Sequence, residues 1–308
     1  MKRLLSVLCC TMFLFSFVGC TNKNDDYTEH QDLEKNEISF FDDALHFDLK
    51  EAGLTNVFIR DMCPSSALVG DDLYARVYLV GDDRYRGNMS TSDHYLMLII
   101  EDKIILEDLK TGNYNARLGG RIEVEDFDGD GYKEILVQEA ADMFGGYGQH
   151  ISRVYKYDDG QIKTIFSSFT DNEHRFDTGF SCTVLEDYNL KIQNKYTGYE
   201  EIFNYRDARK TWYGEKDCTY FGTELLVDSF YSFEPMDVDE DGICEIIGYQ
   251  YTSLNGHTDY VGSAKTVLKY DKNKSEFVVI DAKFIRCDSN TKTWICWSVI
   301  VWIESLLK

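Results

Sequence analysis

Basic residues and prolines are both scarce in this sequence, and each scarcity excludes a class of protein. Lysine and arginine number 32 against 54 aspartates and glutamates, which gives a formal net charge of −22. A chain this acidic is repelled by the phosphate backbone, so a nucleic-acid partner is not expected. With only 2 prolines, 44% hydrophobic and 14% aromatic residues, the chain is also not a disordered polymer. It can bury a substantial core.

Signatures of common enzyme classes are missing as well. The sequence contains no HExxH, no GxSxG, no P-loop and no GxGxxG after a strand, so nucleotide binding is not indicated. No two cysteines form a CxxC pair, which leaves a zinc site of ordinary spacing without support. The cysteines beyond Cys20 are compatible with disulfides or with buried free thiols, and the sequence does not choose between them. They are Cys63, Cys182, Cys218, Cys244, Cys287 and Cys296.

The beginning of the chain has the pattern of an export signal. Lys2 and Arg3 precede a mostly apolar stretch, residues 4–18, which is shorter than the roughly 20 residues that a membrane-spanning helix needs. The block "FVGC" then resembles the lipobox of bacterial lipoproteins, with Phe17 at a position where that family usually has leucine. The alternatives are an ordinary signal peptide or a short membrane anchor.

The lipobox resemblance implies a lipid anchor. Residues 1–19 would be removed as a signal peptide, and Cys20 would carry acyl chains that hold the protein to membrane lipid. Residues 20–37 are polar and without an apolar period, which is typical of a flexible tether. The folded domain is then expected over residues 38–308, in an extracytoplasmic, lipid-anchored protein.

From Ile38 onward the sequence reads as an all-β protein. Short apolar or alternating runs such as "LYARVYLVG", "HYLMLIIED" and "KEILVQEA" are separated by Gly, Asp and Asn, and aromatic and β-branched residues are frequent in them. The C-terminal run Trp294–Ile303 is nearly all apolar but too short to cross a bilayer. It is either a buried terminal element or a surface that anchors the protein or binds a partner.

Two acidic stretches interrupt the strand pattern in the same way. In "DFDGDGYKE" three aspartates stand at the first, third and fifth positions, a glycine at the sixth and a glutamate at the ninth. "DVDEDGICE" repeats this spacing, and the flanking segments also correspond, so that two repeats span about 121–170 and 232–284. Each repeat reads as four short strands, which predicts a β-propeller-like arrangement of antiparallel four-stranded units with an uncertain number of blades.

These loops start like an oxygen-rich Ca²⁺ loop, but the bidentate acid that an EF-hand has at its twelfth position is absent. The pattern DxDxDGxxE before an apolar strand resembles the calcium loops of FG-GAP and VCBS repeats, which occur in integrin-α-like propellers and bacterial surface proteins. The resemblance implies two structural Ca²⁺ ions. Its ligands or loop-closing groups would be Asp126, Asp128, Asp130, Tyr132 and Glu134 in one loop, and Asp237, Asp239, Asp241, Ile243 and Glu245 in the other.

A cation is one of two explanations for these loops. Carboxylates this close together repel one another unless a cation neutralises them, whereas the alternative is an Asx-rich turn in which they bind backbone amides. Oxygen ligands in a flexible loop favour Ca²⁺ over Mg²⁺ and softer metals. The predicted function is therefore a membrane-anchored calcium-binding β-repeat protein that acts as a surface binding or scaffolding module for a cell-wall glycan or a protein. The alternative is a carbohydrate-active enzyme, similar to a glycoside hydrolase, on a small propeller.

Overall fold

The computed structural model divides the chain into two compact units, Met1–Phe47 and Asp48–Lys308, and all the residues that it describes lie in the second. The predicted signal peptide, Cys20, the tether of residues 20–37 and the apolar C-terminal run lie outside the described residues. In the described ranges no helix has the length and apolar character needed to cross a membrane. The described residues are Leu49, Leu54, 57–82, 93–109, 120–142, 149–169, 176–205, 224–253 and 260–286.

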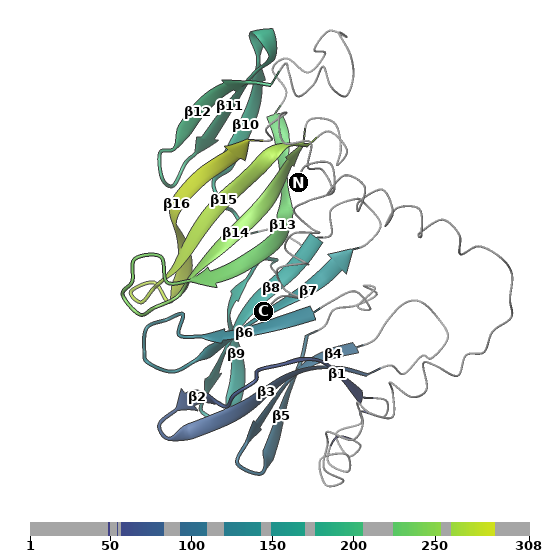
Figure 1. The fold of residues 1–308 in the computed structure, drawn as a ribbon. Helices are drawn as coiled ribbons and strands as arrows, with labels where there is room; N and C mark the ends of the chain where they lie inside the picture. The colour runs from purple at the N-terminus through teal and green to yellow at the C-terminus, as the bar shows by residue number, and fades with distance from the viewer. Residues whose placement is uncertain are drawn as a thin grey trace, which may run out of the picture. The chain divides into compact units, whose positions relative to one another are not determined.

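The all-β prediction is confirmed, because strands make up most of the described residues and form three antiparallel sheets, none of which closes on itself (Figure 1). In the first sheet β1 and β2 both pair with β3, and β3, β4 and β5 follow one another as hairpins. Its strands are β1 (Val57–Met62), β2 (Ala67–Gly70), β3 (Leu73–Asp82), β4 (Asp93–Ile100) and β5 (Lys103–Asp108).

The second sheet is the four-stranded unit predicted for the first repeat. Its strands pair in chain order, β6-β7-β8-β9, and the first acidic loop (residues 126–134) joins β6 to β7. The strands are β6 (Gly120–Glu125), β7 (Glu134–Asp142), β8 (Gln149–Asp158) and β9 (Gln161–Ser167).

The third sheet contains the second repeat and three further strands. Four strands, β13-β14-β15-β16, pair in chain order, and the second acidic loop (residues 237–245) joins β13 to β14. β10 pairs with β13, so that β10, β11 and β12 extend this sheet rather than forming a unit of their own. The strands are β10 (Phe180–Leu185), β11 (Asn189–Asn194), β12 (Glu200–Asn204), β13 (Glu224–Met236), β14 (Glu245–Ser253), β15 (Tyr260–Asp271) and β16 (Glu276–Arg286), with a short 3-10 turn, η3 (Glu186–Tyr188), between β10 and β11.

The second sheet packs against both of the others, which explains why β7 is apolar at consecutive positions. Ile135 and Val137 lie in one core with residues of the first sheet such as Leu79. Leu136, on the opposite face of the strand, lies in a second core with Phe233 of β13. Neighbouring residues of a strand point to opposite faces of the sheet. A strand that is buried on both faces is therefore apolar at consecutive positions and does not alternate with polar residues.

A buried glutamine joins the second sheet to the third. The side chain of Gln138 in β7 donates to the carbonyl of Phe233 at 2.9 Å and accepts from the N–H of the same residue at 3.0 Å. Its amide therefore pairs with β13 as another peptide group would. Both residues are fully or nearly fully buried. Water therefore cannot take the place of the glutamine as a hydrogen-bond partner of Phe233.

Replacing Gln138 by alanine is expected to lower the free energy of unfolding by roughly 1–3 kcal/mol, because the buried N–H of Phe233 loses its acceptor, whereas the Phe233 carbonyl keeps the hydrogen bond from Arg121. Urea denaturation followed by far-UV circular dichroism measures this change. The exposed Gln161 in β9 is the matched control, and its alanine variant should stay within about 0.5 kcal/mol of the parent. Equal effects of the two substitutions would contradict the interpretation.

Candidate functional site

Both acidic loops have the same backbone conformation. The fourth and sixth residues of the first loop, Gly129 and Gly131, have φ values of 71° and 91°. Their counterparts in the second loop, Glu240 and Gly242, have φ values of 61° and 89°. A glutamate at a left-handed position is uncommon, so the second loop holds this conformation even without the glycine that favours it.

The first aspartate of each loop closes the turn on itself. The Asp126 carboxylate accepts from the N–H groups of Gly129 at 2.6 Å and Gly131 at 3.0 Å. The Asp237 carboxylate accepts from Asp241 at 3.0 Å and Gly242 at 2.9 Å. These bonds satisfy backbone groups inside the turn and hold the following carboxylates close together.

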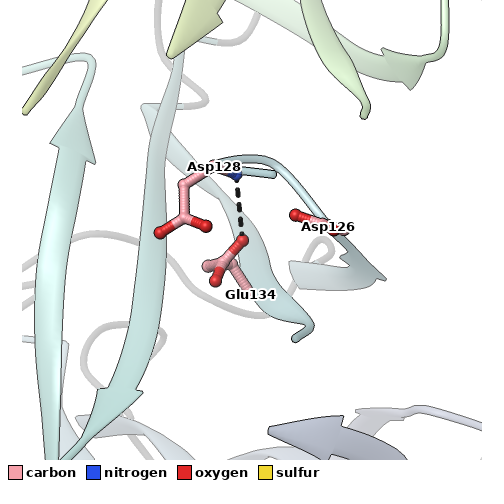
Figure 2. Close-up of side chains that lie close together, drawn as sticks. All are labelled: Asp126, Asp128 and Glu134. Carbon is pink, nitrogen blue, oxygen red and sulfur yellow. Dashed lines mark hydrogen bonds between the residues drawn. The ribbon is translucent and has the colours of Figure 1, made fainter. Parts of the chain in front are cut away.

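The glutamate at the ninth position is the buried part of each loop. Glu134 is 1% exposed, and its Oε2 accepts from the N–H of Phe127 at 2.9 Å and, less well, from that of Asp128 at 3.3 Å. Figure 2 shows Asp126, Asp128 and Glu134 close together at the turn. Glu245 is 0% exposed and accepts from the N–H of Val238 at 2.9 Å through Oε2. In both loops the second glutamate oxygen, Oε1, accepts no backbone hydrogen bond from the described residues and lies beside the other carboxylates of the loop.

These side chains form two groups that could hold a metal ion. One carboxylate oxygen from each of Asp126, Asp128 and Glu134 lies within 4.8 Å of the others, and the same holds for Asp237, Asp239 and Glu245. All these donors are hard oxygens, which suits Ca²⁺ better than zinc or copper. The predicted residues at the fifth position, Asp130 and Asp241, lie beside the groups, and each accepts from the N–H two residues on. The predicted residues at the seventh position, Tyr132 and Ile243, provide those N–H groups.

The sequence prediction missed a lysine in each cluster. Lys156 Nζ in β8 pairs with Asp128, lies 2.5 Å from an Asp130 oxygen and lies 3.7 Å from Glu134 Oε1. The signal was present, because both repeats carry a lysine in the motif "KYD", at positions 156 and 269.

Lys269 in β15 takes the same place in the second loop. Its Nζ lies 2.9 Å from Asp239, 2.8 Å from Asp241 and 2.6 Å from Glu245 Oε1. The contact with Glu245 is a close ion pair but not a well-aligned hydrogen bond, and that buried oxygen has no hydrogen-bond donor in the described part of the chain. The ammonium thus approaches all three acidic side chains.

The pKa values follow from burial and from these pairs. Burial raises the pKa of Glu134 from 4.5 to about 7, against the hydrogen bond from Phe127. For Asp130, burial favours a higher pKa, but the hydrogen bonds from Lys156 and the Tyr132 N–H outweigh it and the pKa is lowered. The hydrogen bond to Asp241, followed by the contacts with Glu245 and Asp239, raises the pKa of Lys269. Both lysines therefore stay charged at neutral pH.

We expect Glu134→Gln to flatten the pH dependence of stability in calcium-free solution. The folded-state pKa lies above the ordinary value, so the stability that proton binding provides is complete below pH 4.5 and is lost as the pH rises through about 7. The parent should therefore lose roughly 1–3 kcal/mol more than the variant between about pH 5 and about pH 8. Urea denaturation with a chelator tests this, with the exposed Glu276→Gln as control. Parallel curves for parent and Glu134→Gln would refute the expectation.

The two acidic loops also contact each other, which the sequence does not reveal. The N–H of Cys244, the eighth residue of the second loop, donates to the carbonyl of Asp126, the first residue of the first loop, at 2.8 Å. Ile243 covers Gly129, whose added Cβ would lie 2.4 Å from the isoleucine methyl group, and Lys272 Nζ donates to the Gly129 carbonyl at 2.6 Å. Each loop is therefore part of the other's surroundings.

The first loop rests on the β2–β3 turn in the same manner. The N–H of Lys133, again the eighth residue, donates to the carbonyl of Leu68 at 2.8 Å. The hydroxyl of Tyr132 donates to Asp71 in that turn. β2 and the turn that follows it thus hold the first loop through one backbone and one side-chain hydrogen bond, although this segment lacks the acidic spacing.

A buried histidine in the first two sheets is structural. His94 Nδ1 lies 2.7 Å from Glu139 Oε1, and the two side chains are 2% and 3% exposed. Arg153 lies 3.7 Å from the other Glu139 oxygen and donates to the Leu109 carbonyl at 2.9 Å. Groups this buried do not reach a substrate, so this pair does not support the carbohydrate-active alternative.

Comparison with known proteins gives one family and one relative. Residues 178–285 match the family described as the YybI C-terminal domain, a range that corresponds to the third sheet. A Bacillus subtilis (strain 168) protein with the name "Uncharacterized protein YybI" is 26% identical over 163 residues, which cover 49% of this chain. The chain spans 58% of that relative's length. No solved structure matches the chain.

Proposed function

We propose that this protein binds two Ca²⁺ ions in its acidic loops and acts as a lipid-anchored, extracytoplasmic binding or scaffolding module. The observation that carries the proposal is the duplication of one oxygen arrangement. Each loop combines an aspartate that closes the turn, two further aspartates and a buried glutamate in an equivalent position. An Asx turn explains the aspartates, but it does not require a buried glutamate whose second oxygen faces them.

The charge within each loop supports a divalent ion. The first loop has four carboxylates, and its lysine, Lys156, pairs with three of them. The four are those of Asp126, Asp128, Asp130 and Glu134. Two like charges at 4 Å repel each other by about 4 kcal/mol at an effective dielectric constant near 20. A Ca²⁺ ion held by these oxygens would supply the missing positive charge and would stabilise the folded state, to which alone it binds.

The arrangement of the sheets supports a repeat protein of the FG-GAP or VCBS kind. Each of the three sheets contains a meander of four strands, and an acidic loop is the first connection in two of them. The eighth residue of each acidic loop donates its backbone N–H to the preceding unit, Cys244 to Asp126 and Lys133 to Leu68 of β2. A propeller-like stack uses this order, since a single blade cannot bury both of its faces. The propeller arrangement and the membership of that family are parts of the proposal.

Isothermal titration calorimetry on the full chain tests the proposed function. We expect two Ca²⁺ ions to bind per chain, more tightly than Mg²⁺, because a flexible oxygen cage does not impose octahedral geometry. The part of the tyrosine-excited terbium luminescence that is lost in a Tyr132→Phe variant reports on the first loop separately. Absence of calcium binding at millimolar concentration would overturn the proposal.

The proposed membrane attachment depends on Cys20. Replacing Cys20 by serine removes the thiol that would be acylated, and we expect the variant to leave the membrane fraction for the soluble fraction. Immunoblotting of both fractions measures this, with Cys63→Ser as a control that retains Cys20. Unchanged membrane association of the Cys20→Ser variant would contradict the lipid anchor.

The partner in this proposal is a cell-wall glycan or a surface protein. Binding of the calcium-loaded protein to immobilised cell-wall glycans and peptides, compared with binding in a chelator, tests for such a partner. Consumption of a glycan in the same assay would favour the carbohydrate-active alternative instead.

A further inference from the structure

The fold fixes the position of the lysine in each acidic cluster. In the second sheet Ile135 of β7 pairs with Tyr155 of β8. In the third sheet Ile246 of β14 pairs with Leu268 of β15. The next residues in register are the buried glutamate and the lysine, so the ammonium is delivered to the same point of both loops by strand pairing.

The lysines are also enclosed to the same degree. Lys156 and Lys269 are each 24% exposed, whereas lysines that pair with carboxylates elsewhere on these sheets, such as Lys163 and Lys274, are 52% and 58% exposed. The side chains of Lys156 and Lys269 are thus mostly covered by the protein, and their ammonium groups lie among the carboxylates. They contact the residues at the third, fifth and ninth positions, and those at the third and ninth belong to the groups that could hold a cation.

We propose that Lys156 and Lys269 are built-in competitors of the cation, each of which closes its acidic loop with an ammonium that must withdraw before Ca²⁺ can bind. This inference rests on the proposed function, because it concerns access to the same two sites. The ammonium and the cation share two carboxylates in each loop, those of the third and ninth residues, and like charges exclude simultaneous close approach. Calcium binds only to the fraction of molecules in which the lysine has left the loop. The apparent calcium affinity is therefore the intrinsic affinity multiplied by that open fraction.

The arrangement has a consequence for the cation-free protein. An ammonium keeps the acidic loop folded by offsetting part of its repulsion, so that the loops do not depend on calcium for their shape. The protein can therefore fold without calcium, but it binds calcium more weakly than it would without the lysines. The site would respond to changes in a calcium concentration that is already high.

The test replaces both lysines by methionine, which retains the length and apolar stem of the side chain without its charge. We expect the Lys156→Met, Lys269→Met variant to bind Ca²⁺ about tenfold more tightly or better, measured by calorimetry on the full chain. The control is Lys163→Met with Lys274→Met, which removes two exposed positive charges from the same sheets and leaves the clusters intact. It should bind calcium as the parent does.

The outcomes distinguish this inference from the proposed function. Tighter binding by the variant than by a parent that binds supports both. Binding by the variant alone supports the competition and overturns the proposed function, since the lysines would then fill the loops permanently. A parent that binds and a variant that binds equally or more weakly overturns the inference and leaves the function standing, and absence of binding in both overturns both.

A second variant covers a failure to fold. Without the ammonium the cation-free loops lose their counter-charge, so the methionine variant should melt at a lower temperature in a chelator and recover in calcium. If it does not fold in either condition, Lys156→Gln with Lys269→Gln retains a hydrogen-bond donor without the charge. This variant should still bind calcium more tightly than the parent, and equal affinity would overturn the inference.

Discussion

Replacing Asp126 and Asp237 together by alanine is expected to remove the calcium-dependent part of the protein's stability. Each carboxylate closes its loop through two backbone N–H groups and belongs to its acidic cluster. One site saturated at about 100 times its dissociation constant adds about 2.7 kcal/mol, so two sites add about 5 kcal/mol. Thermal unfolding with calcium and with a chelator measures the difference between the two conditions.

Asp177 provides the matched control for this double variant. Its carboxylate also accepts from a backbone N–H, that of Gly179 at 2.9 Å, and pairs with Lys195, but it lies outside both loops. Asp177→Ala should therefore lower stability a little in both conditions and keep the full calcium response. A calcium response that persists in the Asp126→Ala, Asp237→Ala variant would place the ions elsewhere.

Phe127→Ala is expected to have the largest effect on stability in the absence of calcium. The side chain is 0% exposed and lies with Leu136, Phe230 and Phe233 in the core shared by the second and third sheets. Truncation of a buried phenylalanine costs roughly 3–5 kcal/mol, because the cavity that remains adds to the lost burial. Denaturation in urea with a chelator measures this loss.

The second position of the other loop supplies the comparison. Val238 corresponds to Phe127 in the repeat but is 48% exposed, and Val238→Ala should change stability by less than about 0.5 kcal/mol. Phe127 thus anchors the first loop in the core, whereas the second loop is open at this position. Comparable losses for both variants would mean that the loops have equivalent surroundings.

The sequence predicted the features that depend on local pattern. Alternation and apolar runs located the strands, and the aspartate and glycine spacing located the two loops, because a tight acidic turn needs particular side chains at particular positions. The structure brings Asp126, Asp128 and Glu134 together, and likewise Asp237, Asp239 and Glu245, as that spacing predicted. Calcium as the ligand remains a prediction.

Features that depend on partners far apart in the chain were not predictable. The repeated "KYD" marks the two lysines in the sequence, but only the strand pairing shows that they reach the loops. The segment of β10–β12 joins the edge of the third sheet through β10, because an edge strand offers free backbone groups to any neighbouring strand. Local periodicity carries no information about which edge is used.

The hydrogen bond between the eighth residue of one loop and the first residue of its neighbour uses only peptide groups. Substitution of a side chain at either position therefore leaves this hydrogen bond intact, and the two donor residues, Lys133 and Cys244, already differ. The first sheet makes the same bond without an acidic loop, since the acceptor there is the carbonyl of Leu68 in β2. A substitution that removed the acidic side chains of one loop would therefore leave its hydrogen bond to the next unit in place.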